Sequence, residues 1–303
     1  MNLRLLTNTR SLPALAPSAT LAVGIFDGVH RGHQAVLRAA MERAKAIGGE
    51  AWVLTFEPNP LAILAPERLP PRLTSLEVRR ERFEALGLDG CITIPFTHEL
   101  SKLTPQQFYH DILCPDGWSP DTIFAGENWH FGAGGKGTLA TISELGGRVQ
   151  TVPPVLDSDG VISSTRIRTA LQCGDIATAN RLLGYEYVSR GVVVQGRKVG
   201  RTLGFPTANL QVDTLLPKSG VYAVKVRVEN KTYSAIANIG TRPTFHASEP
   251  AFEVHILNFD GDLYGQTLDV TFLSRLRDER TFASAEALTK QITEDITQRI
   301  QRF

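Results

Sequence analysis

Two histidines spaced three residues apart lie in a glycine-rich stretch near the N-terminus, AVGIFDGVHRGH at residues 22–33. The apolar run at its start predicts a buried strand, Asp27-Gly28 breaks that strand, and the apolar spacing from Gln34 to Ile47 predicts a helix. The first turn of a helix presents unpaired amides to an anion, and the helix dipole favours negative charge there. His30 and His33 can therefore face one phosphate. We interpret the stretch as a phosphate site rather than as a solvated turn with incidental histidines.

The first half of the chain alternates apolar runs with helical spacing, which predicts a parallel sheet with helices on both faces. Ligands of such sheets bind at the carboxyl ends of the strands. Asn59 and Asn128 follow two of the expected strands, so both are candidate ligand contacts, although Asn59 between two prolines is otherwise an ordinary turn residue. After the first strand we expect strands at 51–56, 91–94, 122–125 and 148–152, and helices at 34–47, 77–86, 105–113 and 176–183.

The glycine-rich run at residues 126–137, GENWHFGAGGKG, contains two misleading patterns. Residues 132–137 match G-x-G-x-x-G, but no expected strand ends directly before them, as a dinucleotide fingerprint requires. The run also fails as a P-loop, because Lys136 is followed by glycine and not by Ser or Thr. We expect a flap over a ligand, in which Trp129 and Phe131 are either ligand contacts or core residues.

A helix start is predicted at ISSTRIR, residues 162–168. Serines that cap a helix whose first turns carry arginine would place hydroxyls, amides and a guanidinium around a phosphate. An ordinary N-cap with solvated arginines is the alternative. The candidate phosphate contacts in this run are Ser163, Ser164, Thr165 and Arg168.

From Tyr187 onward the chain consists of short β-branched and aromatic segments separated by turns, which predicts an antiparallel β-barrel. A terminal amphipathic helix follows, since apolar residues recur every four positions from Leu288 to Ile300. We expect two domains, residues 1–184 and residues 187–303. The barrel strands are expected at 192–194, 222–228, 233–238, 252–257 and 268–272.

The run GRKVGRTLGFPTAN at residues 196–209 combines glycines, basic side chains and a proline. Its glycines allow the backbone to approach phosphates closely, while Thr207 and Asn209 offer neutral oxygens that Mg²⁺ accepts beside phosphate and water. A plain turn could account for residues 196–200 but not for the whole run. Glu253 lies on an alternating strand, where the pattern alone predicts a solvent-facing carboxylate.

Together these motifs resemble those of the bacterial bifunctional riboflavin kinase/FAD synthetase (FMN adenylyltransferase) family. Residues 22–33 resemble its G-x-F-D-G-x-H-x-G-H signature, residues 55–60 its T-F-E-P-x-P element, and residues 196–209 its G-R-x-L-G-F-P-T-A-N loop. The resemblance covers about residues 20–300. Trp129 stands where the family usually has Phe, and Asn258 where Asp is common.

The resemblance implies an α/β fold, with a Rossmann-like nucleotidyltransferase domain followed by an antiparallel β-barrel and a terminal helix. It implies ATP-dependent phosphorylation of riboflavin to FMN and adenylylation of FMN to FAD, with release of pyrophosphate. His30 and His33 would be catalytic in adenylyl transfer, Glu253 would be the base of the kinase, and Mg²⁺ would bind at Thr207 and Asn209. The implied nucleotide contacts are Gly24, Phe26, Asp27, Gly28, Asn59, Asn128, Ser163, Ser164, Thr165, Arg168, Gly196, Gly200, Arg201, Gly204 and Pro206.

Composition excludes several other classes of protein. The net charge of the 303 residues is +1, from 32 basic and 31 acidic side chains, so no global field favours nucleic acid or an anionic membrane. No apolar run is long enough to cross a bilayer. The three cysteines lack C-x-x-C spacing, which argues against disulfides and structural zinc and, with no N-terminal signal, favours the cytoplasm. The oligomeric state is left open.

Two other functions are alternatives to this interpretation. A nucleotidyltransferase for another phosphorylated alcohol, of the cytidylyl or pantetheine type, would lack the G-F-P-T-A-N barrel. A flavin-binding regulator without catalysis is disfavoured because both histidines, Thr207, Asn209 and Glu253 are intact.

Overall fold

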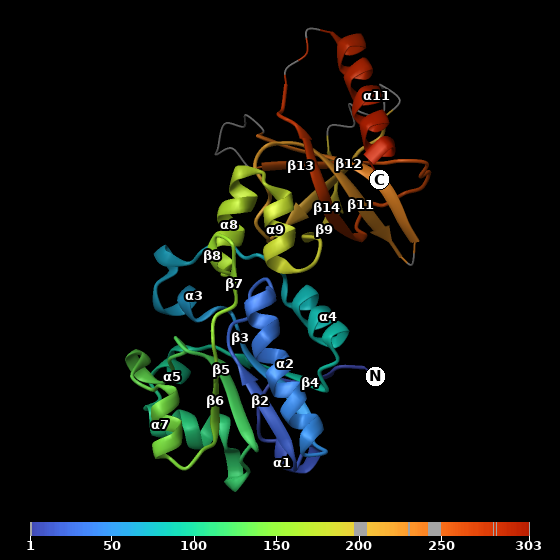
Figure 1. Cartoon of the computed structure of the whole chain (residues 1–303). Coiled ribbons are helices and arrows are strands. Elements are labelled where there is room, and N and C mark those ends of the chain that lie inside the picture. Colours follow the sequence, from blue (N-terminus) through green and yellow to red (C-terminus); the bar gives the residue numbers. More distant parts are fainter. Residues whose placement is uncertain are drawn as a thin grey trace. The chain divides into compact units, whose positions relative to one another are not determined.

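The computed structural model describes residues 2–196, 205–229, 231–241, 250–280, 282 and 284–302. They form two compact units (Figure 1). The first comprises Met1–Pro70 and Leu76–Ser163, and the second Pro71–Ser75 and Ser164–Phe303. The helices that follow Ser163 thus group with the second unit. The assignment of one activity to residues 1–184 and the other to 187–303 stays a prediction.

The first unit is built on a six-stranded parallel sheet with the strand order β1-β4-β3-β2-β5-β6, which confirms the predicted α/β architecture. The three-residue edge strand β1 was not predicted. Leu21 and Val23 of β2 face one core cluster and Ala22 faces the other, because successive side chains of a strand point to opposite faces. A strand buried on both faces is typical of parallel sheets and explains the continuous apolar run. The strands are β1 (Arg4–Leu6), β2 (Ala19–Val23), β3 (Glu50–Glu57), β4 (Gly90–Pro95), β5 (Thr122–Gly126) and β6 (Val149–Val152).

Helices cover both faces of this sheet. α2 (Arg31–Ala46) and α4 (Leu76–Leu86) bury Leu37 and Phe83 in one core cluster, whereas α6 and α7 bury residues in the other. Figure 1 shows α2 lying along the sheet strands. The remaining elements of the first unit are α1 (Leu12–Leu15), α3 (Pro60–Leu64), α5 (His98–Ser101), α6 (Pro105–Phe108), α7 (Leu139–Glu144), and a hairpin of β7 (Leu156–Asp157) and β8 (Gly160–Val161). Short 3-10 helices lie at Pro66–Arg68, Pro115–Gly117 and Ala133–Gly135, and a π-helix at Tyr109–Leu113 follows α6 directly.

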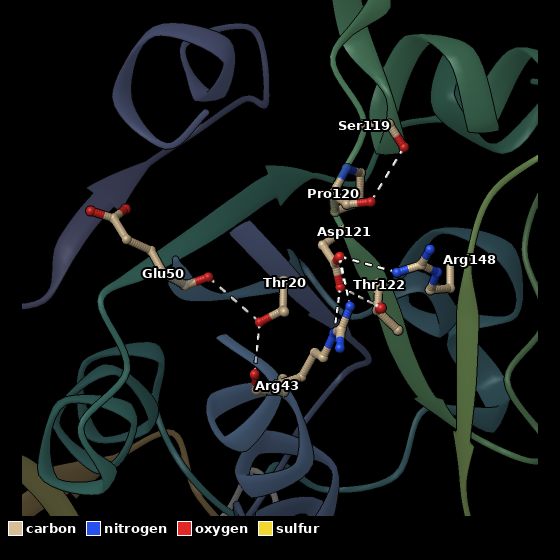
Figure 2. A network of polar contacts seen from close by, with 9 residues as sticks. Thr20, Arg43, Glu50, Ser119, Pro120, Asp121, Thr122 and Arg148 are labelled. Atoms are coloured by element: carbon tan, nitrogen blue, oxygen red, sulfur yellow. Dashed lines mark hydrogen bonds and ion pairs between the residues drawn. The ribbon is translucent and has the colours of Figure 1, made fainter. Parts of the chain in front are cut away.

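An ion-pair network anchors the last turn of α2 to the residue that precedes β5 (Figure 2). Arg43 donates from Nε and Nη2 to the two carboxylate oxygens of Asp121, at 2.7 and 2.9 Å, and Arg148 donates to the same carboxylate at 3.2 Å. The hydrogen bond from Arg43 is the main reason that the pKa of Asp121 lies below its usual range. Bidentate guanidinium–carboxylate pairs fix orientation as well as charge. The network therefore holds the C-terminal end of α2, opposite the end that carries the two histidines.

The second unit contains a closed antiparallel barrel with the strand order β10-β13-β12-β11-β14-β9, which confirms the predicted barrel. The terminal helix, α11 (Ala285–Arg302), is also confirmed. The strand at β10 was not predicted. The strands are β9 (Val188–Val194), β10 (Ala208–Val212), β11 (Gly220–Val228), β12 (Lys231–Thr241), β13 (Pro250–Ile256) and β14 (Thr267–Arg277).

Two helices, α8 (Ser164–Cys173) and α9 (Ile176–Leu183), belong to the barrel unit. The side chain of Asn180 on α9 accepts a hydrogen bond from the Tyr187 amide at 2.7 Å and donates to the Phe272 carbonyl at 3.1 Å. α9 is thereby tied to both β14 and the residue that precedes β9. Within the part of the chain that the structure describes, no helix is long and apolar enough to cross a membrane.

Candidate active sites

The two N-terminal histidines lie against each other at the start of α2. The helix begins at Arg31, three residues earlier than expected, so His30 is its N-cap, and its Nδ1 accepts the His33 amide hydrogen at 3.3 Å. The imidazole rings stack with their centroids 3.6 Å apart. A methyl group at Gly32 would lie 3.1 Å from the His30 ring, so glycine is what lets the ring fold back on the helix. The structure thus brings together the two histidines that the spacing singled out.

The turn between β2 and α2 has an unusual backbone. Phe26, Gly28 and Val29 all have positive φ, at 53°, 85° and 37°. The Phe26 ring is buried and contacts His33 and Phe83 edge-on, with centroids 5.4 and 5.9 Å apart. The Phe26 ring is therefore part of the core, and its predicted nucleotide contact would have to come from its main chain. Gly24 and Asp27, the other predicted contacts of this turn, lie in the same loop, with the side chain of Asp27 buried.

The turns that follow β3 and β5 lie at the same sheet edge as this loop. β2 pairs in parallel with β3 on one side and with β5 on the other, so all three carboxyl ends meet where the chain order of the sheet reverses. Such switch points are the usual ligand sites of open parallel sheets. Asn59 caps α3, accepting the Leu61 amide hydrogen at 3.0 Å, and its amide group can still donate. Asn128 is exposed beyond β5, and its contact with a ligand stays a prediction.

The glycine-rich run after β5 folds back on itself. Phe131 pairs with Gly137 through two backbone hydrogen bonds, and its ring is buried in the core of the first unit. Trp129 is half-buried and stacks on Phe131, with ring centroids 4.9 Å apart. A side chain at Gly137 would lie 2.8 Å from the Phe131 ring. Phe131 is therefore a core residue, and Trp129 covers it.

The predicted helix start at Ser163-Ser164 agrees with α8, which begins at Ser164. Ile162 lies beside the start of α2. A methyl group added at Gly32 would be 3.4 Å from the Ile162 carbonyl oxygen. Ser164, Thr165 and Arg168 belong to the second unit, where Arg168 Nε donates to the carbonyl of Pro71 at 2.7 Å.

A second group of predicted residues converges on the outside of the barrel. Phe252, Val254 and Ile256 of β13 are buried in the barrel, so Glu253 and His255 between them point outward. Glu253 lies opposite Asn209 in the pairing of β10 with β13.

Thr207 and Glu253 meet in this pairing. The hydroxyl of Thr207 lies 3.5 Å from a carboxylate oxygen of Glu253, although the two residues are separated by 46 positions in sequence. Asn209 is buried, and any side chain at Gly196 would overlap its amide group. Three oxygen-bearing side chains therefore gather beside a glycine.

A cavity of about 660 Å³ opens next to Thr207. Pro206, which lines the cavity, is held from outside it by His255, whose Nδ1 lies 2.8 Å from the Pro206 carbonyl oxygen. Gly200, Arg201 and Gly204, which the sequence places in the same loop, lie outside the described residues. The described residues that line the cavity include Pro206, Thr207, Val254, Phe259, Leu263 and Tyr264.

Comparison with known proteins gives two family models, one for the N-terminal and one for the C-terminal part of the chain. Residues 13–166 match the family model of FAD synthetase, and residues 183–303 match that of riboflavin kinase. A Bacillus subtilis protein described as a bifunctional riboflavin kinase/FMN adenylyltransferase is 37% identical, over 94% of this chain and 92% of its own. An Escherichia coli protein of the same description is also 37% identical, over 91% and 90%. The chain belongs to the bifunctional riboflavin kinase/FMN adenylyltransferase family.

A solved structure has the same fold along the whole chain. The crystal structure of a Streptococcus pneumoniae protein described as a macrolide-efflux protein is 35% identical, covers 98% of each chain and superposes with a TM-score of 0.86. Its description differs from those of the curated relatives of the riboflavin kinase/FMN adenylyltransferase family. The family membership of this chain rests on the two family models and the curated relatives.

Some residues near the candidate sites could not be found from the sequence motifs. Arg79 is a charged residue on the buried face of α4, beside Val78 and Phe83, and a charge at such a position was the available signal. The ring residues Phe259 and Tyr264 that line the barrel cavity carried no such signal, because they lie in a turn without a periodic pattern.

Proposed function

We propose that the first unit adenylylates FMN at the edge of the sheet where His30 and His33 meet, and that the barrel phosphorylates riboflavin beside Glu253. The two family models support the two reactions. The stacked histidines at a helix start and the cluster of oxygen donors on the barrel support the assignment of residues.

Adenylyl transfer requires hydrogen-bond donors to the phosphates more than it requires a general base. The nucleophile is the phosphate of FMN, which is already anionic at neutral pH, while negative charge grows on the α-phosphate of ATP and on the departing pyrophosphate. The N-terminal amides of α2 favour an anion at that position. Because His30 Nδ1 accepts the His33 amide hydrogen, the neutral imidazole carries its proton on Nε2 and can donate from there. Preorganised donors of this kind stabilise developing charge.

Riboflavin phosphorylation has the opposite requirement. The attacking group is a ribityl hydroxyl, a poor nucleophile, and a carboxylate at Glu253 can accept its proton. Thr207 and Asn209 would bind Mg²⁺ together with phosphate oxygens and water, which suits an ion that prefers oxygen ligands. When bound, Mg²⁺ would neutralise charge on the transferred phosphoryl group. The cavity beside Thr207 is wide and partly apolar enough to take the ring system of one substrate.

The protein residues alone would not complete the ligand set of Mg²⁺, so phosphate oxygens of the substrate would supply the other ligands. Among the described residues, no group of three or more His, Cys, Asp or Glu side chains could hold a metal ion. A hydroxyl, a carboxamide and one nearby carboxylate instead resemble the usual Mg²⁺ arrangement, in which substrate phosphates complete the ligand set. Ser163, Ser164, Thr165 and Arg168 stay predicted nucleotide contacts, and a cytoplasmic enzyme without nucleic-acid or membrane partners stays a prediction from composition.

The observation that carries the proposal is the close stacking of His30 and His33 at the first turn of α2. The test incubates the purified chain with riboflavin, ATP and Mg²⁺ and separates the flavins. We expect FMN and then FAD, and absence of both products would refute the proposed function. His30→Ala should slow FAD formation from supplied FMN by about 10²- to 10³-fold, typical of losing one preorganised donor. FMN formation from riboflavin should be unchanged in this variant.

A further inference from the structure

A buried arginine on α4 forms a hydrogen bond with the backbone of the turn that leads to the two histidines. Arg79 is 3% exposed, and its Nη1 donates to the carbonyl oxygen of Ile25 at 3.0 Å. Its Nη2 forms an ion pair with Glu57 at the end of β3. Thr55, also on β3, donates its hydroxyl hydrogen to the same Ile25 oxygen at 3.1 Å. One carbonyl therefore accepts two side-chain donors, from a helix and from a strand.

This carbonyl lies where ordinary sheet pairing ends. The register of β2 with β3 stops at Val23, opposite Leu54, and Phe26 directly after Ile25 already has positive φ. Non-glycine residues in this conformation persist only where their surroundings hold them. Arg79 and Thr55 thus bind a carbonyl that lies beyond the paired residues of β2 and β3, next to the point where the turn with positive φ begins.

The same helix holds the next residue of the turn. Phe83 lies four positions after Arg79, on the same buried face of α4, and its ring contacts Phe26 edge-on. Further along, Gln34 Nε2 donates to the carbonyl of Val29 at 2.9 Å. The turn is thus fixed at its start by α4 and β3 and at its end by α2.

We propose that Arg79 is a positioning residue for FMN adenylylation, which sets the place of His30 and His33 through the Ile25 carbonyl. The inference rests on the proposed function of the first unit. Arg79 touches no substrate in this role. It orients the loop, and a displacement of about 1 Å at a reacting group can reduce a rate by about 10²-fold.

The variants are Arg79→Met, which keeps the apolar stem, and Arg79→Lys, which keeps the charge but not the two-pronged geometry. Arg80→Met is the matched control. Arg80 is the next residue of α4 and is also part-buried, but it donates to Thr93 on β4 and not to the loop. Each chain is assayed for FAD formation from FMN and for FMN formation from riboflavin, the second activity reporting on folded enzyme.

We expect Arg79→Met to lower kcat for FAD formation by about 10- to 100-fold, with the KM values for FMN and ATP changed less than about 3-fold. Arg79→Lys should restore part of this loss, and FMN formation should stay at the parental level in all three variants. The inference is overturned if the kcat of Arg79→Met for FAD formation stays within about 2-fold of the parent. It is also overturned if Arg80→Met lowers this kcat as much as Arg79→Met does.

If Arg79→Met does not accumulate in folded form, the variant Thr55→Val tests the inference in its place. This change removes the other donor to Ile25 and preserves the shape of the buried side chain, which is 0% exposed. A kcat for FAD formation lowered by at least about 3-fold supports the positioning role of the hydrogen bonds to the Ile25 carbonyl, and an unchanged kcat overturns it. A parent chain that makes no FAD would instead refute the proposed function, so the two failures are distinguishable.

Discussion

Replacing Gly196 by alanine tests the proposed kinase site by a steric change alone. Gly196 has no positive φ, so alanine adopts its backbone without strain, but the new methyl carbon would lie 2.1 Å from Asn209 Nδ2 and 2.5 Å from Cγ. Ordinary contact between such atoms is about 3.5–4 Å, so the amide group must move by more than about 1 Å. Asn209 is buried and short, which leaves it little room to yield.

A shift of about 1 Å at a group that we propose to bind Mg²⁺ beside the phosphates should lower kcat for riboflavin phosphorylation by about 10²-fold. Adenylylation of supplied FMN should not change, because no residue of the first unit is altered. The assay separates FMN and FAD by chromatography after incubation with ATP and Mg²⁺. Thermal melting accompanies it, since overpacking costs about 1–3 kcal/mol and lowers Tm by several degrees.

A double-mutant cycle makes the reasoning refutable. If the alanine acts by displacing the Asn209 amide, Gly196→Ala combined with Asn209→Ala should be no worse than Asn209→Ala alone. Additive losses in the double variant would show that the methyl group acts elsewhere. Gly196→Ala enzyme with FMN formation within about 2-fold of the parent would refute the placement of Asn209 in the kinase site.

Three further predictions concern stability, the adenylylation site and the barrel. Because the pKa of Asp121 is lowered in the folded state, its contribution to stability is present above its ordinary pKa and is lost as pH falls through the depressed value. Asp121→Asn should lower the urea midpoint at pH 7 and make stability less dependent on pH below about 4, as measured by denaturation at several pH values. Gly32→Ala, whose methyl group would press on the His30 ring at 3.1 Å, should slow FAD formation by about 3- to 10-fold without affecting FMN formation, and an unchanged rate would contradict the stacked geometry. A fragment of residues 187–303 should make FMN. A longer fragment, residues 164–303, should melt at a higher temperature because it retains α9 and its hydrogen bonds to the barrel. Equal melting temperatures of the two fragments would show that α9 does not stabilise the barrel.

Much of the local structure could be predicted because it depends on neighbours in sequence. The apolar residues whose helical spacing predicts α2 are Val36, Leu37, Ala40 and Ala44, and all four are buried in the structure. The helix at 176–183 was predicted with the bounds it has. Periodicity indicates which face of an element is apolar, and that face must be buried. The family motifs added the two reactions, which the family models and curated relatives bear out.

Other local features were missed where the signal was weak or shared with a turn. β1 has three residues, too few to show a period, and β10 follows directly on a loop of glycines, threonines and proline. The start of α2 was predicted too late because histidine is an uncommon N-cap, and no local pattern indicates that the ring nitrogen of His30 would cap the helix.

The sequence by itself determined the kind of each element and the residue types that could bind phosphate and metal. The tertiary structure decided which of them meet. Glu253 reaches Thr207 only because β13 pairs with β10, and Arg79 reaches Ile25 only because α4 packs its buried face on the turn after β2. Such contacts join residues more than 40 positions apart, and their energy depends on strand register and helix packing, which no local pattern specifies.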